Sequence, residues 1–134
     1  MKIMLDTDIC IYLLNQKHPQ LLDKMENFPI GDIAISSIVL AELENGVQQS
    51  THRERNLARL EQFLATLDII PFHAVAAKFY GKIRSHLTKQ GSLIGGNDLL
   101  IAAHALSENR ALVTNNHREF ARIPDLVILD WLVL

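Results

Sequence analysis

The stretch that most limits how this chain can fold is Lys2–Asp8, where an apolar run of strand length ends in Asp6, Thr7 and Asp8. The apolar segment Ile9–Leu14 follows at once and is too long to be a turn. This order predicts a buried strand that leads into a helix, with Asp6 at the carboxyl end of the strand. Ligands of open α/β sheets bind at that edge. Asp6 is therefore expected to be a metal ligand, a nucleophile or the cap of the next helix.

The rest of the chain alternates between short apolar runs and longer segments with helical periodicity, which predicts an α/β fold with a parallel sheet. Leu22 and Val75 fall on the apolar faces of two of these helices. Pro71 indicates that the third strand is short or near an edge. The further strands are expected at 33–35, 68–72, 111–113 and 127–129, and the further helices at 19–28, 38–49, 74–89 and 99–106, with another opening at Thr51 or His52. The glycine-rich loop 90–96 must turn sharply or approach something closely.

Composition narrows the class of protein. The length of 134 residues suits a single domain, spanning residues 1–134, and the lone Cys10 excludes an intramolecular disulfide or a two-thiolate zinc site. No apolar run reaches the ~20 residues of a membrane-spanning helix, and the start of the chain lacks a signal-peptide pattern. We therefore expect a cytoplasmic protein without membrane contact. The net charge of −2 argues against a DNA-coating protein but not against an RNA enzyme with a local acidic site.

The side chains that could carry chemistry are mostly carboxylates at strand ends and helix starts. They are Asp6, Asp8, Glu42, Glu44, Asp98, Asn116 and Glu119. Converging carboxylates without thiolates suit Mg²⁺ or Mn²⁺ better than zinc. Such an ion can orient and acidify a water molecule and stabilise charge on a phosphodiester.

Each carboxylate also has a purely structural interpretation. Asp6 and Asp8 flank the first helix, where an acid can cap backbone N–H groups, and capping is the favoured role for Asp8 but not for Asp6. Asp98 could be only a first-turn acid. It adjoins a buried helix and a glycine-rich loop, however, where an unpaired carboxylate would be costly.

Helical geometry does not separate Glu42 from Glu44. The two residues lie at opposite margins of the apolar stripe of their helix, and an isolated helical Glu is usually solvated. The six histidines show no metal-ligand spacing, and His104 is expected to be a hydrogen-bonded core residue rather than a ligand. Arg118 and Arg122 lie just past the polar end of the fourth strand and could hold an RNA phosphate backbone.

Four motifs, in order, resemble those of PIN-domain ribonucleases and, more closely, of the VapC toxins of bacterial type II toxin–antitoxin pairs. They are Met4–Thr7, Ile35–Ser37 followed by Ala41–Leu43, Asp98–His104, and Val113–Asn116 with Glu119–Phe120. The similarity extends from Met1 to Trp131. It implies a Mg²⁺-dependent endoribonuclease (with Mn²⁺ as a possible substitute) on a twisted five-stranded parallel sheet flanked by helices. It also implies a homodimer, inhibition by a small VapB-type antitoxin, and a possible larger assembly with that antitoxin on operator DNA.

The resemblance also assigns roles to residues. Asp6 and Asp98 match the metal-binding acids, and Glu42 rather than Glu44 matches the acid on the third helix. Similar toxins of enteric type cut the anticodon stem-loop of initiator tRNA, which is the substrate implied here. An arginine or an apolar helix of the antitoxin is expected to enter the acidic cleft and displace the metal, as charge complementarity favours.

Two positions depart from the family pattern. Asn116 stands where many PIN domains have a fourth Asp, and Glu119, one turn on, could supply the missing carboxylate, which leaves open whether one or two metal ions bind. Asp8 stands where relatives commonly have Asn, and its charge could either tighten a cation or repel phosphate. Thr7 and Thr114 are expected to orient the ligand side chains or water.

Two alternatives come from other functional classes. Asp6–Asp8 after a buried strand resembles the nucleophile and general acid of haloacid-dehalogenase-type phosphatases, with Ser36 or Ser37 as the phosphate-binding hydroxyl. That interpretation gives Glu42 no role and finds no suitably placed lysine; Asp8→Asn would cripple such a phosphatase but not a PIN nuclease. The other alternative is an RNA-binding module without catalysis, which Asn116 favours slightly.

Overall fold

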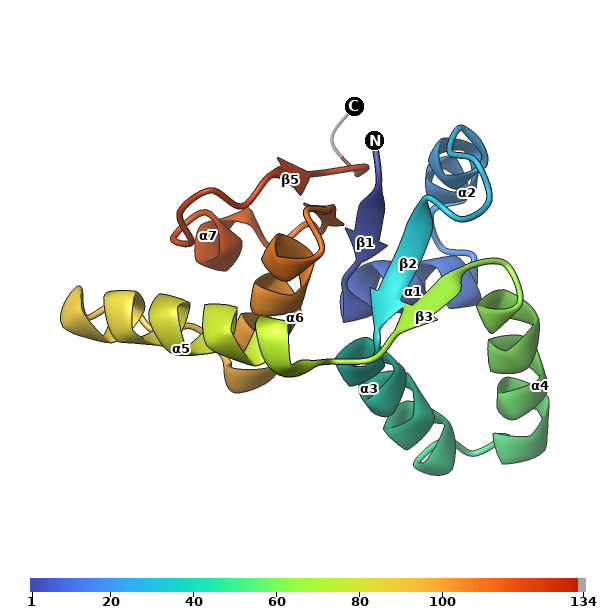
Figure 1. The fold of residues 1–134 in the computed structure, drawn as a ribbon. Helices are drawn as coiled ribbons and strands as arrows, with labels where there is room; N and C mark the ends of the chain where they lie inside the picture. Colours follow the sequence, from blue (N-terminus) through green and yellow to red (C-terminus); the bar gives the residue numbers. More distant parts are fainter. Residues whose placement is uncertain (133–134) are drawn as a thin grey trace.

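The strands form one parallel sheet in the order β3-β2-β1-β4-β5 (Figure 1). This computed structural model describes residues 1–132. Central β1 pairs with β2 and β4, so that Met4 lies beside Ala34 and Leu112. The bounds are β1 Ile3–Leu5, β2 Ile33–Ser36, β3 Asp68–Ile70, β4 Ala111–Val113 and β5 Ile128–Leu129. The predicted α/β class and five-stranded parallel sheet are confirmed, and β3 lies at an edge, as Pro71 indicated.

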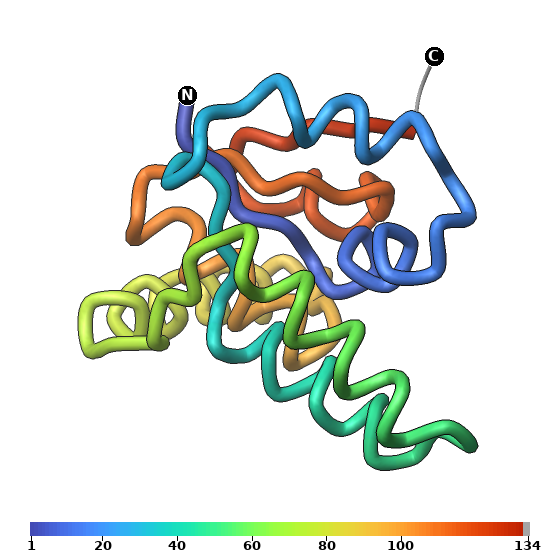
Figure 2. The backbone as a smooth tube through the Cα atoms, turned by 90° about the vertical axis from the view of Figure 1, so that its right-hand side faces the viewer, coloured from blue at the N-terminus to red at the C-terminus, as the bar shows by residue number. Residues whose placement is uncertain are grey.

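The helices connect successive strands and cover the sheet. Helices α3 and α4 form a hairpin that extends away from the sheet, and α5 packs along α6 (Figures 1 and 2). The bounds are α1 Thr7–Asn15, α2 Pro19–Glu26, α3 Ser37–Gln48, α4 Arg53–Leu64, α5 Ala74–Lys89, α6 Gly96–Ser107 and α7 His117–Phe120. None of these helices is long and apolar enough to cross a membrane.

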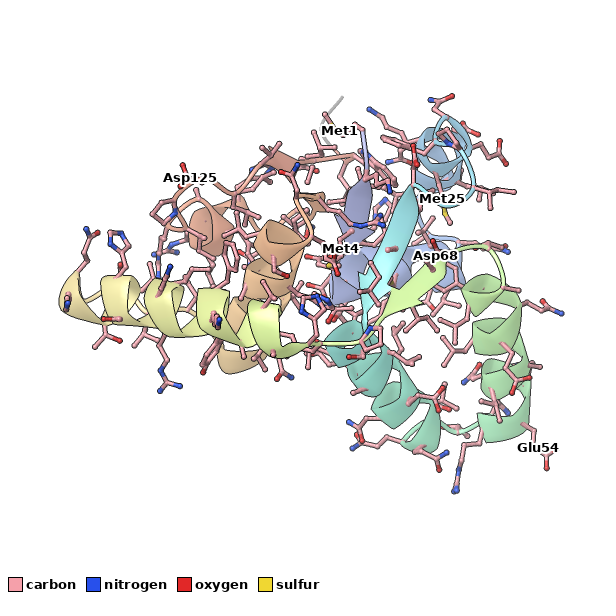
Figure 3. The ribbon with its side chains drawn as sticks, in the orientation of Figure 1. Met1, Met4, Met25, Glu54, Asp68 and Asp125 are labelled. Atoms are coloured by element: carbon pink, nitrogen blue, oxygen red, sulfur yellow. The ribbon has the colours of Figure 1, made fainter. Side chains whose placement is uncertain are left out.

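The core lies on both sides of β1 and β4, whose residues are all buried. Figure 3 shows Met4 inside the molecule and Glu54 projecting from the outer end of α4. Two of the apolar-face predictions are wrong: Leu22 is 54% exposed and Val75 51% exposed. The reason is that α2 and α5 are each covered on a narrower face than their apolar residues span, so the flanking positions remain in contact with solvent.

The glycine-rich loop between α5 and α6 positions the start of α6. Gly91 has φ +65°, a left-handed conformation that a side chain would strain. The loop therefore turns sharply there, one of the two roles that its composition predicted. Gly95 is the N-cap residue of α6 and directly precedes the turn that carries Asp98.

Candidate active site

The carboxyl ends of β1 and β4 and the first turns of α1 and α6 surround a cavity of about 460 Å³. The strand order reverses between β1 and β4, so the cavity occupies the switch point at which α/β sheets bind ligands. Among the described residues that line it, four are carboxylates and none is basic. The lining residues are Asp6, Thr7, Asp8, Ile11, Glu42, Asn45, Asn97, Asp98 and Asn116.

Asp6 combines a structural and an electrostatic role. Its Oδ1 accepts the Ile9 N–H at 2.9 Å, so Asp6 is the N-cap of α1, and the favoured assignment of the cap to Asp8 is wrong. Asp6 is only 4% exposed. Its pKa is raised overall from 3.8 to about 6, chiefly by burial; hydrogen bonds from Thr114 and the Ile9 N–H oppose the rise, and the charges of Asp8 and Glu42 add to it. Asp8 is exposed in the first turn, at the rim of the cavity.

Asp98 lies across the cavity in the first turn of α6. Burial is the main cause that raises its pKa to about 7, and its carboxyl is close enough to Glu119 to share a hydrogen bond that adds to the rise. The charges of Asp6 and Glu42 act in the same direction. Asn116 Nδ2 donates to Glu119 Oε2 at 3.1 Å, which ties Glu119 to the loop after β4.

The tertiary structure separates Glu42 from Glu44. Thr7 Oγ1 donates to Glu42 Oε1 at 2.6 Å, which joins α1 to α3 at the cavity. Glu44 is exposed and does not line the cavity. The buried Thr114 interacts with Asp6 and accepts the Asn116 N–H at 2.9 Å. Thr7 and Thr114 are therefore placed to orient the acidic side chains, as expected.

Two residues that line the cavity were not predicted, and one of the two predicted RNA-binding arginines also has a structural role. Asn45 and Asn97 also line the cavity. Asn45 follows Glu42 by three residues, the spacing of one helix face, and Asn97 precedes Asp98, so both were detectable. Arg122 donates to the carbonyls of Ser92 at 3.4 Å and Leu93 at 3.2 Å, and so holds the loop before α6. Arg118 is exposed, and RNA contacts by these two arginines stay predictions.

The arrangement favours a cation. The carboxylates raise one another's pKa, and the described lining supplies carboxylate, amide and hydroxyl oxygens with no thiolate or imidazole. Oxygen donors around a roomy, polar cavity suit a hard divalent ion that keeps several waters. The residues present therefore fit Mg²⁺ or Mn²⁺ by donor chemistry.

The fold and the acid-lined switch point define a class that the comparisons with known proteins identify. A family model of the PIN domain matches residues 3–126. The chain is 50% identical over 135 residues to "Ribonuclease VapC2" of Rickettsia felis, with 96% of each chain covered. It is 41% identical over 131 residues to "tRNA(fMet)-specific endonuclease VapC" of Shigella flexneri, with 98% of each covered.

Solved structures agree with this class. The crystal structure of VapBC2 from Rickettsia felis bound to a promoter DNA fragment matches with a TM-score of 0.92 and 46% identity, covering 98% of this chain and 99% of that one. DNA-bound VapBC from Salmonella typhimurium matches with a TM-score of 0.92 and 40% identity, covering 98% of each chain. The chain therefore belongs to the PIN-domain family, among the VapC ribonucleases.

The phosphatase alternative fails on the structure as well as on the family. Ser36 Oγ is buried, accepts the Ile38 N–H at 3.1 Å and bonds His104 Nδ1 at 2.7 Å. Ser37 Oγ accepts the Phe72 N–H at 2.9 Å. Both hydroxyls that were candidates for phosphate binding are thus committed to holding elements of the fold together.

Proposed function

We propose that this chain is the toxin of a VapBC-type pair and cleaves the anticodon stem-loop of initiator tRNA with Mg²⁺ held in the acid-lined cavity. The observation that carries the proposal is the meeting of Asp6 and Asp98 at one cavity. Both carboxyls have raised pKa values, and the described lining contains no basic side chain to compensate them. A divalent cation is the partner that would stabilise both in their charged form.

Each residue has a distinct task in this proposal. Asp6 and Asp98 would hold Mg²⁺, or Mn²⁺ in its place, with Glu42, Asn116 and Glu119 completing the site. The bound ion would orient and acidify a water molecule and stabilise charge that develops on the phosphodiester. The rest is positioning by the protein itself: Asp6 is fixed by its cap hydrogen bond to Ile9, and the Asn116 amide holds Glu119 beside Asp98.

In this proposal Glu42 handles a proton. The hydrogen bond from Thr7 occupies Glu42 Oε1. Glu42 Oε2 is then the oxygen that can accept a hydrogen bond or a proton from a water at the cavity. The Thr7 bond spans two helices, so it sets the distance between this carboxylate and the side chains of α1.

The substrate and the partners follow from the relatives. The Shigella flexneri protein is named for tRNA(fMet), and the two structural relatives described above are both VapBC complexes bound to DNA. We extend to this chain an initiator tRNA substrate, a VapB-type antitoxin and assembly with the antitoxin on operator DNA, and we add the homodimer that the family resemblance implies. The negative charge of the described lining favours entry of an antitoxin arginine in place of the cation, and the exposed Arg118 would contact an RNA backbone.

The direct test maps the RNA ends that appear after brief incubation of the purified protein with total RNA and Mg²⁺. New ends confined to the anticodon stem-loop of initiator tRNA, and lost with a chelator, are the expected result. Ends in other RNAs would contradict the substrate, and ends that persist in the chelator would contradict the role of the metal. RNA binding with no new ends would favour the non-catalytic RNA-binding module.

A further inference from the structure

A second polar cluster lies at the other end of α6, about six residues or 9 Å along the helix from Asp98. It consists of His73 at the start of α5, His104 in the last turn of α6 and Glu108 at its C-cap. One ligand atom from each lies within 4.8 Å of the others. The cluster is separate from the acid-lined cavity, whose lining includes none of these residues.

His104 Nε2 is the atom that points to a ligand. His104 is 0% exposed, and within the described part of the chain its Nε2 has no hydrogen-bond partner. Glu108 Oε1 is 4.0 Å away, beyond hydrogen-bond range. Buried polar atoms are nearly always paired. An imidazole nitrogen that is buried, unpaired and directed at a carboxylate and a second imidazole is the arrangement that a metal ion completes.

The fold holds His104 in the orientation that ligation requires. Its Nδ1 lies 2.7 Å from Ser36 Oγ, the hydroxyl that also caps α3. With its ring proton on Nδ1, His104 donates to Ser36 Oγ, as metal-ligating histidines typically donate to an oxygen, and Nε2 then presents its lone pair. Burial lowers the pKa of His104, so the ring is neutral at neutral pH, as a ligand must be. Ser37 Oγ accepts the Phe72 N–H and so fixes the residue next to His73.

The distances are close to those of a metal site. His73 Nε2 and Glu108 Oε1 are 3.0 Å apart. Metal–ligand bonds of about 2.0–2.2 Å in a tetrahedral site place neighbouring ligand atoms roughly 3.3–3.5 Å apart. Shifts of under about 1 Å at the ends of the side chains would therefore suffice for the His73–Glu108 pair and for the His104–Glu108 pair, which is 4.0 Å apart. The side chains of His73 and Glu108 are 38% and 28% exposed, so water can reach a fourth position.

Ligation would change the tautomer of His73. In the metal-free protein His73 Nδ1 accepts the Ala76 N–H at 3.3 Å and caps α5, which puts the ring proton on Nε2 facing Glu108. A metal can bind Nε2 only if that proton leaves. The proton moves to Nδ1 by exchange with solvent, so the ring stays neutral. The hydrogen bonds of His73 to Ala76 and to Glu108 are then both lost, and this cost is set against three new ligand bonds.

We propose that His73, His104 and Glu108 bind a transition-metal ion of the Zn²⁺ type that ties the start of α5 to the end of α6. Two imidazoles and one carboxylate favour Zn²⁺, Co²⁺ or Ni²⁺ over Mg²⁺. The site is thus selective against the ion that suits the carboxylate cavity. Because Ser36 caps α3, which carries Glu42, and α6 carries Asp98, the ion would brace two of the helices that deliver acids to that cavity.

The test titrates Zn²⁺ into metal-free Asp98→Asn protein, in which the acidic cavity has lost one of its carboxylates, and measures affinity by calorimetry. One-to-one binding is expected. The affinity should fall at least about tenfold when His73→Ala or Glu108→Gln is added to this Asp98→Asn parent. The matched control is His117→Ala, since His117 pairs with Asp130 at 2.7 Å in a comparable histidine–carboxylate contact outside the cluster. That variant should bind Zn²⁺ as tightly as its parent.

Two spectroscopic measurements keep the test independent of any one variant. Co²⁺ should give the strong visible absorption of a four-coordinate ion, and NMR should show the His104 ring proton fixed on Nδ1 when Zn²⁺ is bound. Absence of saturable binding would overturn the proposal. So would binding that survives both His73→Ala and Glu108→Gln, or that falls equally in His117→Ala.

Discussion

The two ends of α6 bury polar groups in opposite ways. At the N-terminal end, Asp98 and Asp6 are carboxyls whose pKa values are raised to about 7 and about 6, chiefly by burial and further by neighbouring acids. At the C-terminal end, the pKa of His104 is lowered, chiefly by burial, and Ser36 satisfies its Nδ1. Within the described residues, the lining at one end offers no basic side chain to the carboxyls, and at the other end the Nε2 of a buried imidazole has no hydrogen-bond partner.

This difference has opposite consequences for stability as the pH changes. A folded-state pKa above the ordinary value, as for Asp6, means that stability falls as the pH rises from about 4 through 6. A folded-state pKa below the ordinary value, as for His104, means that stability falls as the pH drops below 6.5. At the first end, a hard cation such as Mg²⁺ would stabilise the charged carboxylates. At the second end, a metal such as Zn²⁺ can bind the imidazoles without a net change in their protonation.

The largest expected effect comes from removing a carboxylate at the N-terminal end. Asp98→Asn keeps the side-chain shape but removes the charge that would hold the cation. Mg²⁺-dependent RNA cleavage should fall by more than about 100-fold with the fold retained, because stabilisation of developing charge is lost. Single-turnover cleavage assays with circular dichroism would measure both. Asp8→Asn, at the exposed rim, is the matched control and should cleave nearly as its parent does; cleavage by Asp98→Asn at the parental rate would refute the assignment.

The second effect is a gain in stability. Asn at position 6 can still accept the Ile9 N–H, so Asp6→Asn removes the buried charge and keeps the cap. In a chelator at pH 8 we expect the free energy of unfolding to rise by about 2–3 kcal/mol, the equivalent of the raised pKa. Near pH 4 the gain should vanish, because the parental carboxyl is then protonated. Urea titrations across pH would show this, and a gain that is independent of pH would contradict the electrostatic account.

The smallest expected effect is a loss of stability at the C-terminal end of α6, where His104 is neutral. Ser36→Ala leaves the Ile38 N–H and His104 Nδ1 without their shared partner and should cost about 2 kcal/mol. Between pH 7 and 9 this loss should be constant, since neither group is charged there. Ser107→Ala, which removes one hydrogen bond to the His104 carbonyl on the same helix, is the control and should change stability by about 0.5 kcal/mol or less.

Local sequence patterns were sufficient for much of the fold. The run that ends at Asp6 predicted both β1 and the helix after it, and the residues 74–89 predicted for a long helix are those of α5. Periodicity was less reliable for exposure, since Leu22 and Val75 are on apolar faces but remain in contact with solvent. Periodicity describes one helix, whereas burial depends on how much of that helix its neighbours cover.

The sequence by itself determined which carboxylates lie at strand ends and helix starts. Strand and helix boundaries follow from local features, namely apolar runs, helical periodicity and capping residues. Helical periodicity did not separate Glu42 from Glu44, and the family resemblance favoured Glu42; the tertiary structure supplies the physical reason, a hydrogen bond from Thr7 on another helix. Only it brought His73 to His104 and Glu108. The physical reason is that side chains far apart in the sequence meet through sheet order and helix packing, which no local spacing encodes.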